Sequence, residues 1–112
     1  MSQITTHVLD TSKGKPADGI TIKLEAKDGE NWSEISRGVT NHDGRISDLL
    51  TQEETLQPGI YKLVFETIPY FNKQQVRSFY PMIEIVFETV DGSHYHVPLL
   101  LNPYGYSTYR GS

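Results

Sequence analysis

Cysteine is absent from this chain of 112 residues. Its absence excludes disulfide frameworks, thiol nucleophiles and cysteine-based zinc sites. Long apolar runs are absent too, because no segment approaches the roughly 20 residues that a membrane helix requires. Residues 1–4 lack the charged and apolar regions of a signal peptide. We therefore expect no membrane association and a cytoplasmic location.

Basic residues are also scarce. The chain has 10 Lys and Arg residues against 14 Asp and Glu, which gives a formal net charge of −4. No basic stripe is present to follow a phosphate backbone, so we expect no nucleic-acid partner. The length predicts one domain over residues 1–112, large enough to bury roughly two thirds of its unfolded surface.

Alternating polarity predicts a chain built almost entirely of β-strands. Segments with β-branched or apolar residues at every second position are separated by turns rich in Gly, Pro, Asn and Asp. The only helix candidate is Pro69–Gln75, with proline in the first turn. These patterns predict an all-β fold, an antiparallel β-sandwich. The expected strands are residues 4–9, 20–27, 32–36, 45–48, 61–66, 82–90, 94–101 and 104–112.

Three histidines and an arginine are the main candidates for chemistry. His94 and His96 lie two residues apart on one predicted strand, so their side chains share a face. His7 lies on the first strand, and Arg45 follows the turn at residues 41–44, where function commonly collects. If they converge, the imidazoles and the guanidinium can orient a flat carbonyl-rich molecule and activate water.

The last residues are unusual for a chain end, which is commonly polar and frayed. Tyrosines stand at 104, 106 and 109, followed by Arg110 and Ser112. Tyrosine is favoured at interfaces because an apolar ring ends in a hydrogen-bonding group. We predict that Tyr104–Ser112 is a strand docked at a subunit interface, with the hydroxyl or terminal carboxylate of Ser112 at the active site.

Each candidate also has an ordinary structural interpretation. Histidines in strands are often partly exposed polar residues, and most arginines lie on the surface. His94 and His96 could bind zinc, with His7 as a third ligand, but a site without metal is favoured. The residues alone leave the function open.

Several segments resemble the 5-hydroxyisourate hydrolases, an enzyme family related to transthyretin. The resemblance covers nearly the whole chain. Its most specific part is the closing tetrapeptide Tyr-Arg-Gly-Ser. The matching segments are residues 6–11 with 14–17, residues 40–45, residues 79–81, and residues 94–101 followed by 109–112.

The resemblance implies a transthyretin-like sandwich of two four-stranded sheets with one short helix at about residues 69–75. It also implies a homotetramer, a dimer of dimers, with active sites in a central channel. The reaction would open the six-membered ring of 5-hydroxyisourate, giving 2-oxo-4-hydroxy-4-carboxy-5-ureidoimidazoline in urate degradation. No metal or organic cofactor is expected.

Site residues carried over by motif position fall into two groups. The resemblance implies a catalytic role for His7, Arg45, His96 and Ser112. It implies substrate binding by Tyr109, Arg110 and Gly111. Which histidine is the general base stays open, and His94 receives no role.

Two other classes compete with the hydrolase. The first is a transthyretin-like carrier of a small aromatic ligand without catalysis, whose channel should be apolar and free of paired histidines and arginines. The second is an immunoglobulin-like adhesion module, which predicts a monomer with inert histidines.

Overall fold

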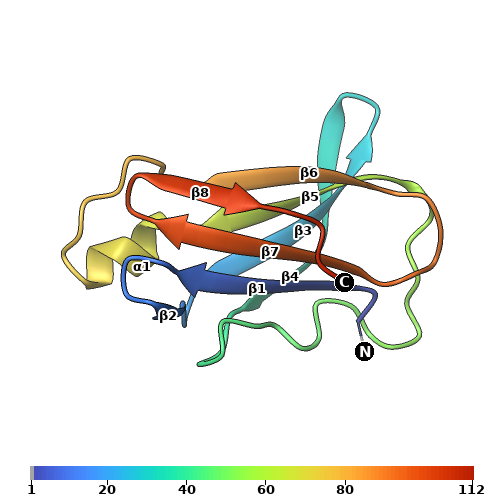
Figure 1. Cartoon of the computed structure of the whole chain (residues 1–112). Coiled ribbons are helices and arrows are strands. Elements are labelled where there is room, and N and C mark those ends of the chain that lie inside the picture. The colour runs from blue at the N-terminus through green and yellow to red at the C-terminus, as the bar shows by residue number, and fades with distance from the viewer. Residues whose placement is uncertain (1) are drawn as a thin grey trace.

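Two four-stranded β-sheets face each other across a hydrophobic core in this computed structural model, which describes residues 2–112 (Figure 1). The sheet orders are β2-β1-β7-β8 and β4-β3-β5-β6. Within these described residues a single short helix, α1, joins β5 to β6. This confirms the predicted sandwich. The elements are β1 Ile4–Asp10, β2 Lys15–Pro16, β3 Thr21–Asp28, β4 Asn31–Val39, β5 Gly59–Glu66, α1 Ile68–Lys73, β6 Ile83–Thr89, β7 Tyr95–Asn102 and β8 Gly105–Thr108.

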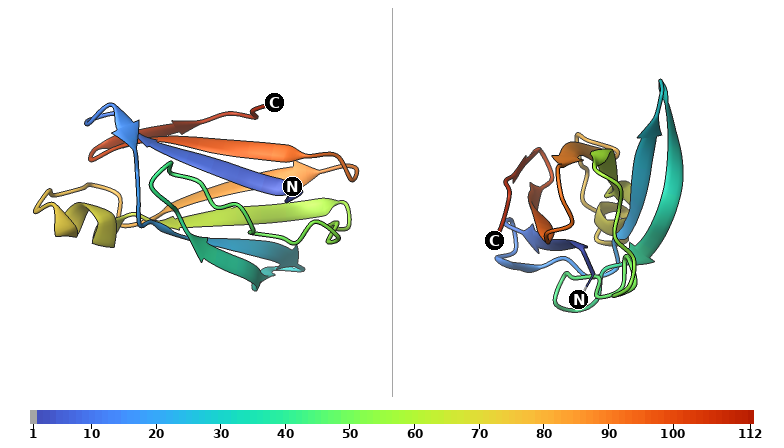
Figure 2. Two further views of the ribbon diagram at one scale, coloured as in Figure 1. Left: turned by 90° about the horizontal axis from the view of Figure 1, so that it is seen from below. Right: turned by 90° about the vertical axis from the view of Figure 1, so that its right-hand side faces the viewer.

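Period-two alternation sorts the side chains of β1 between the core and the outer face of its sheet. Ile4 and Val8 are fully buried, whereas Thr5 and His7 are only partly buried on the opposite face. The end-on view in Figure 2 shows the two layers with this outer face on the β1, β7 and β8 side. The outer face of β1 and β7 is therefore available for a binding site.

One pairing differs from an all-antiparallel sandwich, because β1 and β7 run parallel. Their register joins Ile4 to Tyr95, Thr5 to His96 and so on to Asp10 and Leu101. Parallel neighbours need a long crossover, and here the whole second sheet lies between the two strands in the chain. This register places the outer-face residues of both strands side by side.

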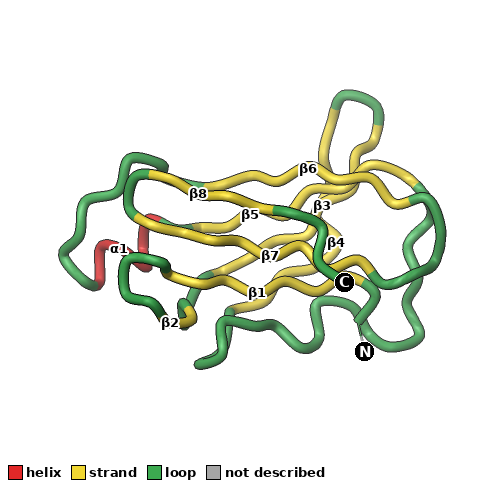
Figure 3. The backbone as a smooth tube through the Cα atoms, viewed as in Figure 1, coloured by secondary structure: helices red, strands yellow, loops and turns green. Residues whose placement is uncertain are grey.

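The predicted strand at residues 45–48 is wrong. Residues 40–58 form a long connection that runs alongside β1, and only Arg45 makes an isolated antiparallel bridge, with His7 (Figure 3). Gly44 has a φ of +74°, a left-handed conformation that closes the turn before Arg45, and residues 46–48 have no pairing partner in either sheet. The return strand is also longer than residues 32–36, since β4 spans Asn31–Val39.

The helix and the last strand are both shorter than predicted. The helix begins at Ile68 with Pro69 in its first turn and ends at Lys73, because the positive φ of Gln75 stops it. Regular pairing of the last strand ends at Thr108, and only Gly111 makes a further bridge. Among residues 2–112, no helix has the length and apolarity to cross a membrane.

A buried carboxylate ties the helix to the first sheet. Asp10 is fully buried and accepts hydrogen bonds from the Tyr70 hydroxyl at 2.6 Å and from the Ser12 backbone N–H at 3.0 Å. Burial alone would raise the pKa of Asp10, but these hydrogen bonds outweigh it and hold the pKa below its usual value. Burial and the bond to Asp10 raise the pKa of Tyr70 to about 12. The ionised carboxylate therefore anchors α1 away from the outer face of the first sheet.

Candidate active site

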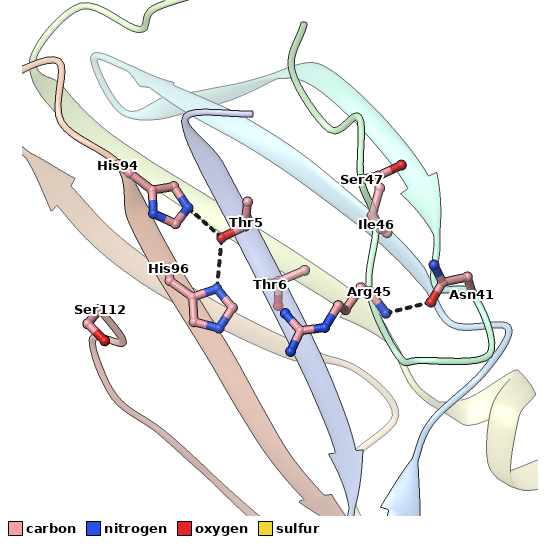
Figure 4. A pocket seen from close by; sticks show the side chains of 9 residues that line it. All are labelled: Thr5, Thr6, Asn41, Arg45, Ile46, Ser47, His94, His96 and Ser112. Atoms are coloured by element: carbon pink, nitrogen blue, oxygen red, sulfur yellow. Dashed lines mark hydrogen bonds between the residues drawn. The ribbon is translucent and has the colours of Figure 1, made fainter. Parts of the chain in front are cut away.

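A cavity of about 690 Å³ lies on the outer face of the first sheet (Figure 4). Three of the four predicted catalytic residues line it, namely Arg45, His96 and Ser112. They come from the loop before β5, from β7 and from the C-terminal tail. Five lining residues were not candidates: Thr5, Thr6, Asn41, Ile46 and Ser47. The ninth is His94, a candidate to which the resemblance gave no role.

Backbone hydrogen bonds hold the Arg45 loop against β1. Val8 N donates to Gly44 O at 2.9 Å, next to the bridge between His7 and Arg45. The Asn41 side-chain oxygen accepts from Arg45 N at 3.1 Å and so closes the turn. A side chain at Gly44 would collide with the Val8 carbonyl oxygen, so only glycine allows this close approach. The guanidinium is thereby directed from a fixed loop toward the cavity.

His7 lies beside the cavity rather than on its lining surface. It follows Thr5 by two residues on the same face of β1 and bridges the backbone of Arg45. A charge on His7 would lower the pKa of His96, and the Arg45 guanidinium lowers the pKa of both histidines. His7, His96 and Arg45 therefore form one electrostatic group.

Thr5 lies between His96 on β7 and His94, which directly precedes this strand. Its hydroxyl oxygen is 2.7 Å from His94 Nε2 and 2.7 Å from His96 Nδ1 (Figure 4). The two rings are stacked with centroids 6.3 Å apart. Period two correctly placed His94 and His96 on one face. His94, which the resemblance left without a role, is a lining residue and shares a hydrogen-bond partner with His96.

The tail reaches the cavity by pairing with β7. Gly111 N donates to His96 O at 2.8 Å, which brings Ser112 to the rim. A Cβ added at Gly111 would come within 2.5 Å of His96 Cδ2, so the ring leaves no room for a side chain. Gly111 thus acts by allowing close packing against the imidazole.

Tyr109 and Arg110 do not line this cavity. They line a second cavity of about 300 Å³ near β6, together with Tyr95. The Arg110 guanidinium carbon lies 4.5 Å above the centre of the Tyr95 ring, a cation–π contact. These two residues hold the tail on the side opposite His96.

Both imidazoles of the electrostatic group favour the neutral form. Burial lowers the pKa of His7, and the nearby Arg45 charge lowers it further; the Asp43 backbone and charge oppose this. Burial, Arg45, His94 and His7, in decreasing order, lower the pKa of His96. At neutral pH each ring therefore has an unprotonated nitrogen that can accept a proton.

The zinc alternative lacks a suitable ligand group. Within residues 2–112, no three His, Asp or Glu side chains come together in an arrangement that could hold a metal ion. The donor set of the cavity, with a guanidinium beside the imidazoles, is better suited to an organic molecule with carbonyl oxygens.

The fold and the site define a class: a transthyretin-type sandwich with a histidine- and arginine-containing cavity on its outer face. The sequence profile of the HIUase/Transthyretin family matches residues 4–111. The chain belongs to this family.

Similar proteins include 5-hydroxyisourate hydrolases and a transthyretin. The chain is 46% identical to the 5-hydroxyisourate hydrolase of Mus musculus, over 99% of this chain and 96% of the mouse protein. The structure of Klebsiella pneumoniae 5-hydroxyisourate hydrolase is similar at a TM-score of 0.84 and 38% identity, covering 97% of this chain and 98% of that one. Sea bream transthyretin in complex with thyroxine is similar at a TM-score of 0.91 and 31% identity, covering 98% and 95%.

The close contact between Gly111 and the His96 ring predicts that position 111 must be glycine. In Gly111→Ala the new methyl group must displace either the His96 ring or the tail, and misplacement by about 1 Å can reduce turnover on the order of 100-fold. The matched control is Gly105→Ala, whose Cβ would have ordinary contacts at 3.7 Å with Asn102. Turnover and thermal unfolding of both variants are the measurements. Equal turnover in the two variants would contradict the close-packing role.

The influence of Arg45 on the histidines can be measured by NMR titration. In Arg45→Gln the charge that disfavours imidazolium is removed, so we expect the pKa of His7 and of His96 to rise toward the ordinary 6.5. Arg77→Gln removes the same charge from an exposed position after α1 and serves as the control. Unchanged pKa values of His7 and His96 in Arg45→Gln would contradict the claim that Arg45 lowers them.

The same pKa shifts set the sign of a stability effect. Since the folded pKa of each histidine is lower than the unfolded value, the unfolded chain binds more protons below about pH 6.5. The free energy of unfolding should therefore fall as the pH drops through this window, and less so in Arg45→Gln.

Proposed function

We propose that this chain is a 5-hydroxyisourate hydrolase of urate degradation. The observation that carries the proposal is the placement of His96, Arg45 and Ser112 around one cavity, with neutral His7 beside it. The product would be 2-oxo-4-hydroxy-4-carboxy-5-ureidoimidazoline. We further propose that residues 1–112 act as a single domain, in the cytoplasm, without a cofactor or a nucleic-acid partner.

The chemistry requires a base for water and donors for the developing oxyanion. A neutral imidazole, His96 or His7, takes a proton from water as the hydroxide adds to a carbonyl carbon of the six-membered ring. The guanidinium of Arg45 donates to the oxygen that becomes negative. The C–N bond then breaks, and the imidazolium returns its proton to the departing ring nitrogen. Atoms and charge balance, and the new carboxyl group remains on the product.

Ser112 and the tail complete the site in this proposal. The Ser112 hydroxyl offers a donor and an acceptor at the rim, where it can hold the hydroxyl or ring N–H groups of the substrate. Tyr109 and Arg110 support substrate binding indirectly, because their packing against the opposite side of β7 fixes the path of Gly111 and Ser112.

A carrier function is the alternative, since sea bream transthyretin binds thyroxine on the same fold. A cavity for a largely apolar ligand needs apolar walls and few polar groups. Here two imidazoles, a guanidinium and several hydroxyl groups surround the space, with Ile46 as the apolar exception. This polarity supports hydrolysis over transport.

The quaternary structure that we propose is a homotetramer, a dimer of dimers. In the described residues, β6 and β8 each pair on one side only, and both edges lie on the same side of the sandwich (Figure 1). Val86 on β6 is 57% exposed, and Tyr106 on β8 is exposed as well. A strand edge that is not protected by charges, bulges or a covering segment can pair with another chain. Assembly would also enclose the half-open cavity in a channel.

Turnover of the proposed substrate tests the function. Fresh 5-hydroxyisourate, generated by urate oxidase in the cuvette, should lose its ultraviolet absorbance faster when this protein is added. His96→Ala and His7→Ala should lower the rate by about 10²- to 10⁴-fold, the usual worth of general base catalysis. The control is His42→Ala, which removes an exposed histidine from the neighbouring turn. Near-wild-type rates in both site variants would refute the assignment.

The mass in solution tests the assembly. Sedimentation should give four times the 12.7 kDa mass of the chain. A charge on a pairing edge opposes association, so Val86→Lys should yield smaller species. Val39→Lys is the matched control, because Val39 is 58% exposed near the opposite edge of the same sheet, on β4. A monomeric wild type, or equal behaviour of the two variants, would refute the proposed edges.

A further inference from the structure

The Thr5 hydroxyl has two imidazole partners and a single hydrogen. Its oxygen lies 2.7 Å from His94 Nε2 and 2.7 Å from His96 Nδ1. A threonine hydroxyl donates one hydrogen bond and accepts up to two. If it donates to one ring, the other ring must donate to it. The tautomers of His94 and His96 are therefore coupled through one oxygen atom.

When both rings are neutral and the Thr5 hydroxyl donates to one of them, two arrangements satisfy the three groups. In the first, His96 Nδ1–H donates to Thr5, whose hydroxyl donates to His94 Nε2. In the second, His94 Nε2–H donates to Thr5, whose hydroxyl donates to His96 Nδ1. The first leaves His96 Nε2 with a free lone pair. The second places a hydrogen there and removes the base.

The surroundings of His96 favour the first arrangement. His96 Nδ1 is the ring nitrogen beside Thr5, 2.7 Å from its hydroxyl oxygen. Although burial and Arg45 lower the pKa of His96 overall, the Thr5 backbone acts in the opposite direction, as expected of an acceptor that faces a ring N–H. The other ring nitrogen, Nε2, lies on the side away from Thr5, where Figure 4 shows the Arg45 guanidinium. A guanidinium has donors only, and a ring N–H facing it would be unfavourable. A lone pair on Nε2 is therefore the compatible state.

We propose that Thr5 is a positioning residue that holds His96 in the Nδ1–H tautomer, with His94 as the acceptor that orients the Thr5 hydroxyl. His96 Nε2 is then the atom that takes the proton from water. This catalytic consequence rests on the proposed hydrolase function, whereas the tautomer is a property of the resting protein. The parallel register supplies the geometry, because it pairs Thr5 directly with His96 and diagonally with His94.

The tautomer is directly observable in the full chain. Long-range ¹H–¹⁵N correlation spectra of ¹⁵N-labelled protein separate protonated from unprotonated ring nitrogens. We expect His96 Nδ1 to be protonated and Nε2 unprotonated above the pKa of the ring. Thr5→Val keeps the β-branched shape but removes the hydroxyl, and should shift His96 toward the Nε2–H form. Thr5→Ser restores the hydroxyl and should restore the wild-type spectrum.

Thr5 lines the cavity, so it could also contact the substrate directly. Kinetic constants distinguish this contact from the positioning of His96. Loss of a group that orients a metal-bound histidine reduces metal affinity or activity about 10- to 100-fold, and we expect an effect of the same order for a group that orients a catalytic histidine. We expect Thr5→Val to lower kcat by this amount with little change in KM, and Thr5→Ser to recover it. A raised KM with an unchanged His96 tautomer would make Thr5 a substrate contact and overturn the proposal.

His94 provides a test of opposite design. In His94→Phe the Thr5 hydroxyl loses the acceptor that orients it and becomes free to donate to His96 Nδ1, which shifts the hydrogen of the His96 ring toward Nε2. This variant should therefore lose activity and show a His96 spectrum shifted toward the Nε2–H form. The double variant Thr5→Val/His94→Phe should match Thr5→Val, because His94 acts only through the Thr5 hydroxyl. Additive losses would overturn the coupling.

The two proposals can fail separately. A wild-type protein with Nε2–H on His96 would overturn the positioning role even if 5-hydroxyisourate is hydrolysed. A wild-type protein with Nδ1–H that is lost in Thr5→Val, but with no turnover of 5-hydroxyisourate, would support the tautomer assignment and refute the hydrolase.

Discussion

The parallel pairing of β1 with β7 is the constraint on which the site depends. It sets Thr5 against His96 and brings the outer faces of the two strands together. The other two segments then attach to this pair: the Arg45 loop through Val8 N and Gly44 O, and the tail through Gly111 N and the His96 carbonyl. Four pieces of chain distant in sequence meet because two central strands offer them free hydrogen-bonding groups.

This dependence explains what the sequence could predict. Alternation with period two is local, so it placed His94 and His96 on one face correctly, and the turn at residues 41–44 marked Arg45. The partnership of Thr5 with both imidazoles depends on strand order and register, which alternation does not encode. The sequence offered one indication that Thr5 belongs to the site: it lies two residues before His7, on the same predicted face of the first strand.

The C-terminal tail, residues 109–112, shows again that the sequence alone does not reveal which residues face the site. Tyr95 and His96 point to opposite sides of β7, so the antiparallel tail alternates with them: Arg110 stacks on Tyr95, whereas Gly111 meets His96. The sequence motif Tyr-Arg-Gly-Ser suggests one site for all four of its residues. Because neighbouring residues of an extended chain face opposite sides, Arg110 and Gly111 are directed differently. Arg110 lines the second cavity, whereas Ser112 lines the first. Glycine is required at position 111 because the His96 ring leaves no room for a side chain.

Electrostatics separates this site from a carrier cavity on the same fold. A guanidinium beside two partly buried imidazoles disfavours their protonation, which lowers stability in acid and does nothing to hold an apolar ligand. The arrangement is useful where neutral nitrogen lone pairs and a positive charge are needed together, as they are when water is deprotonated and an oxyanion forms. The hydroxyl of Thr5 then matters because a neutral imidazole has only one such lone pair, and its direction must be chosen.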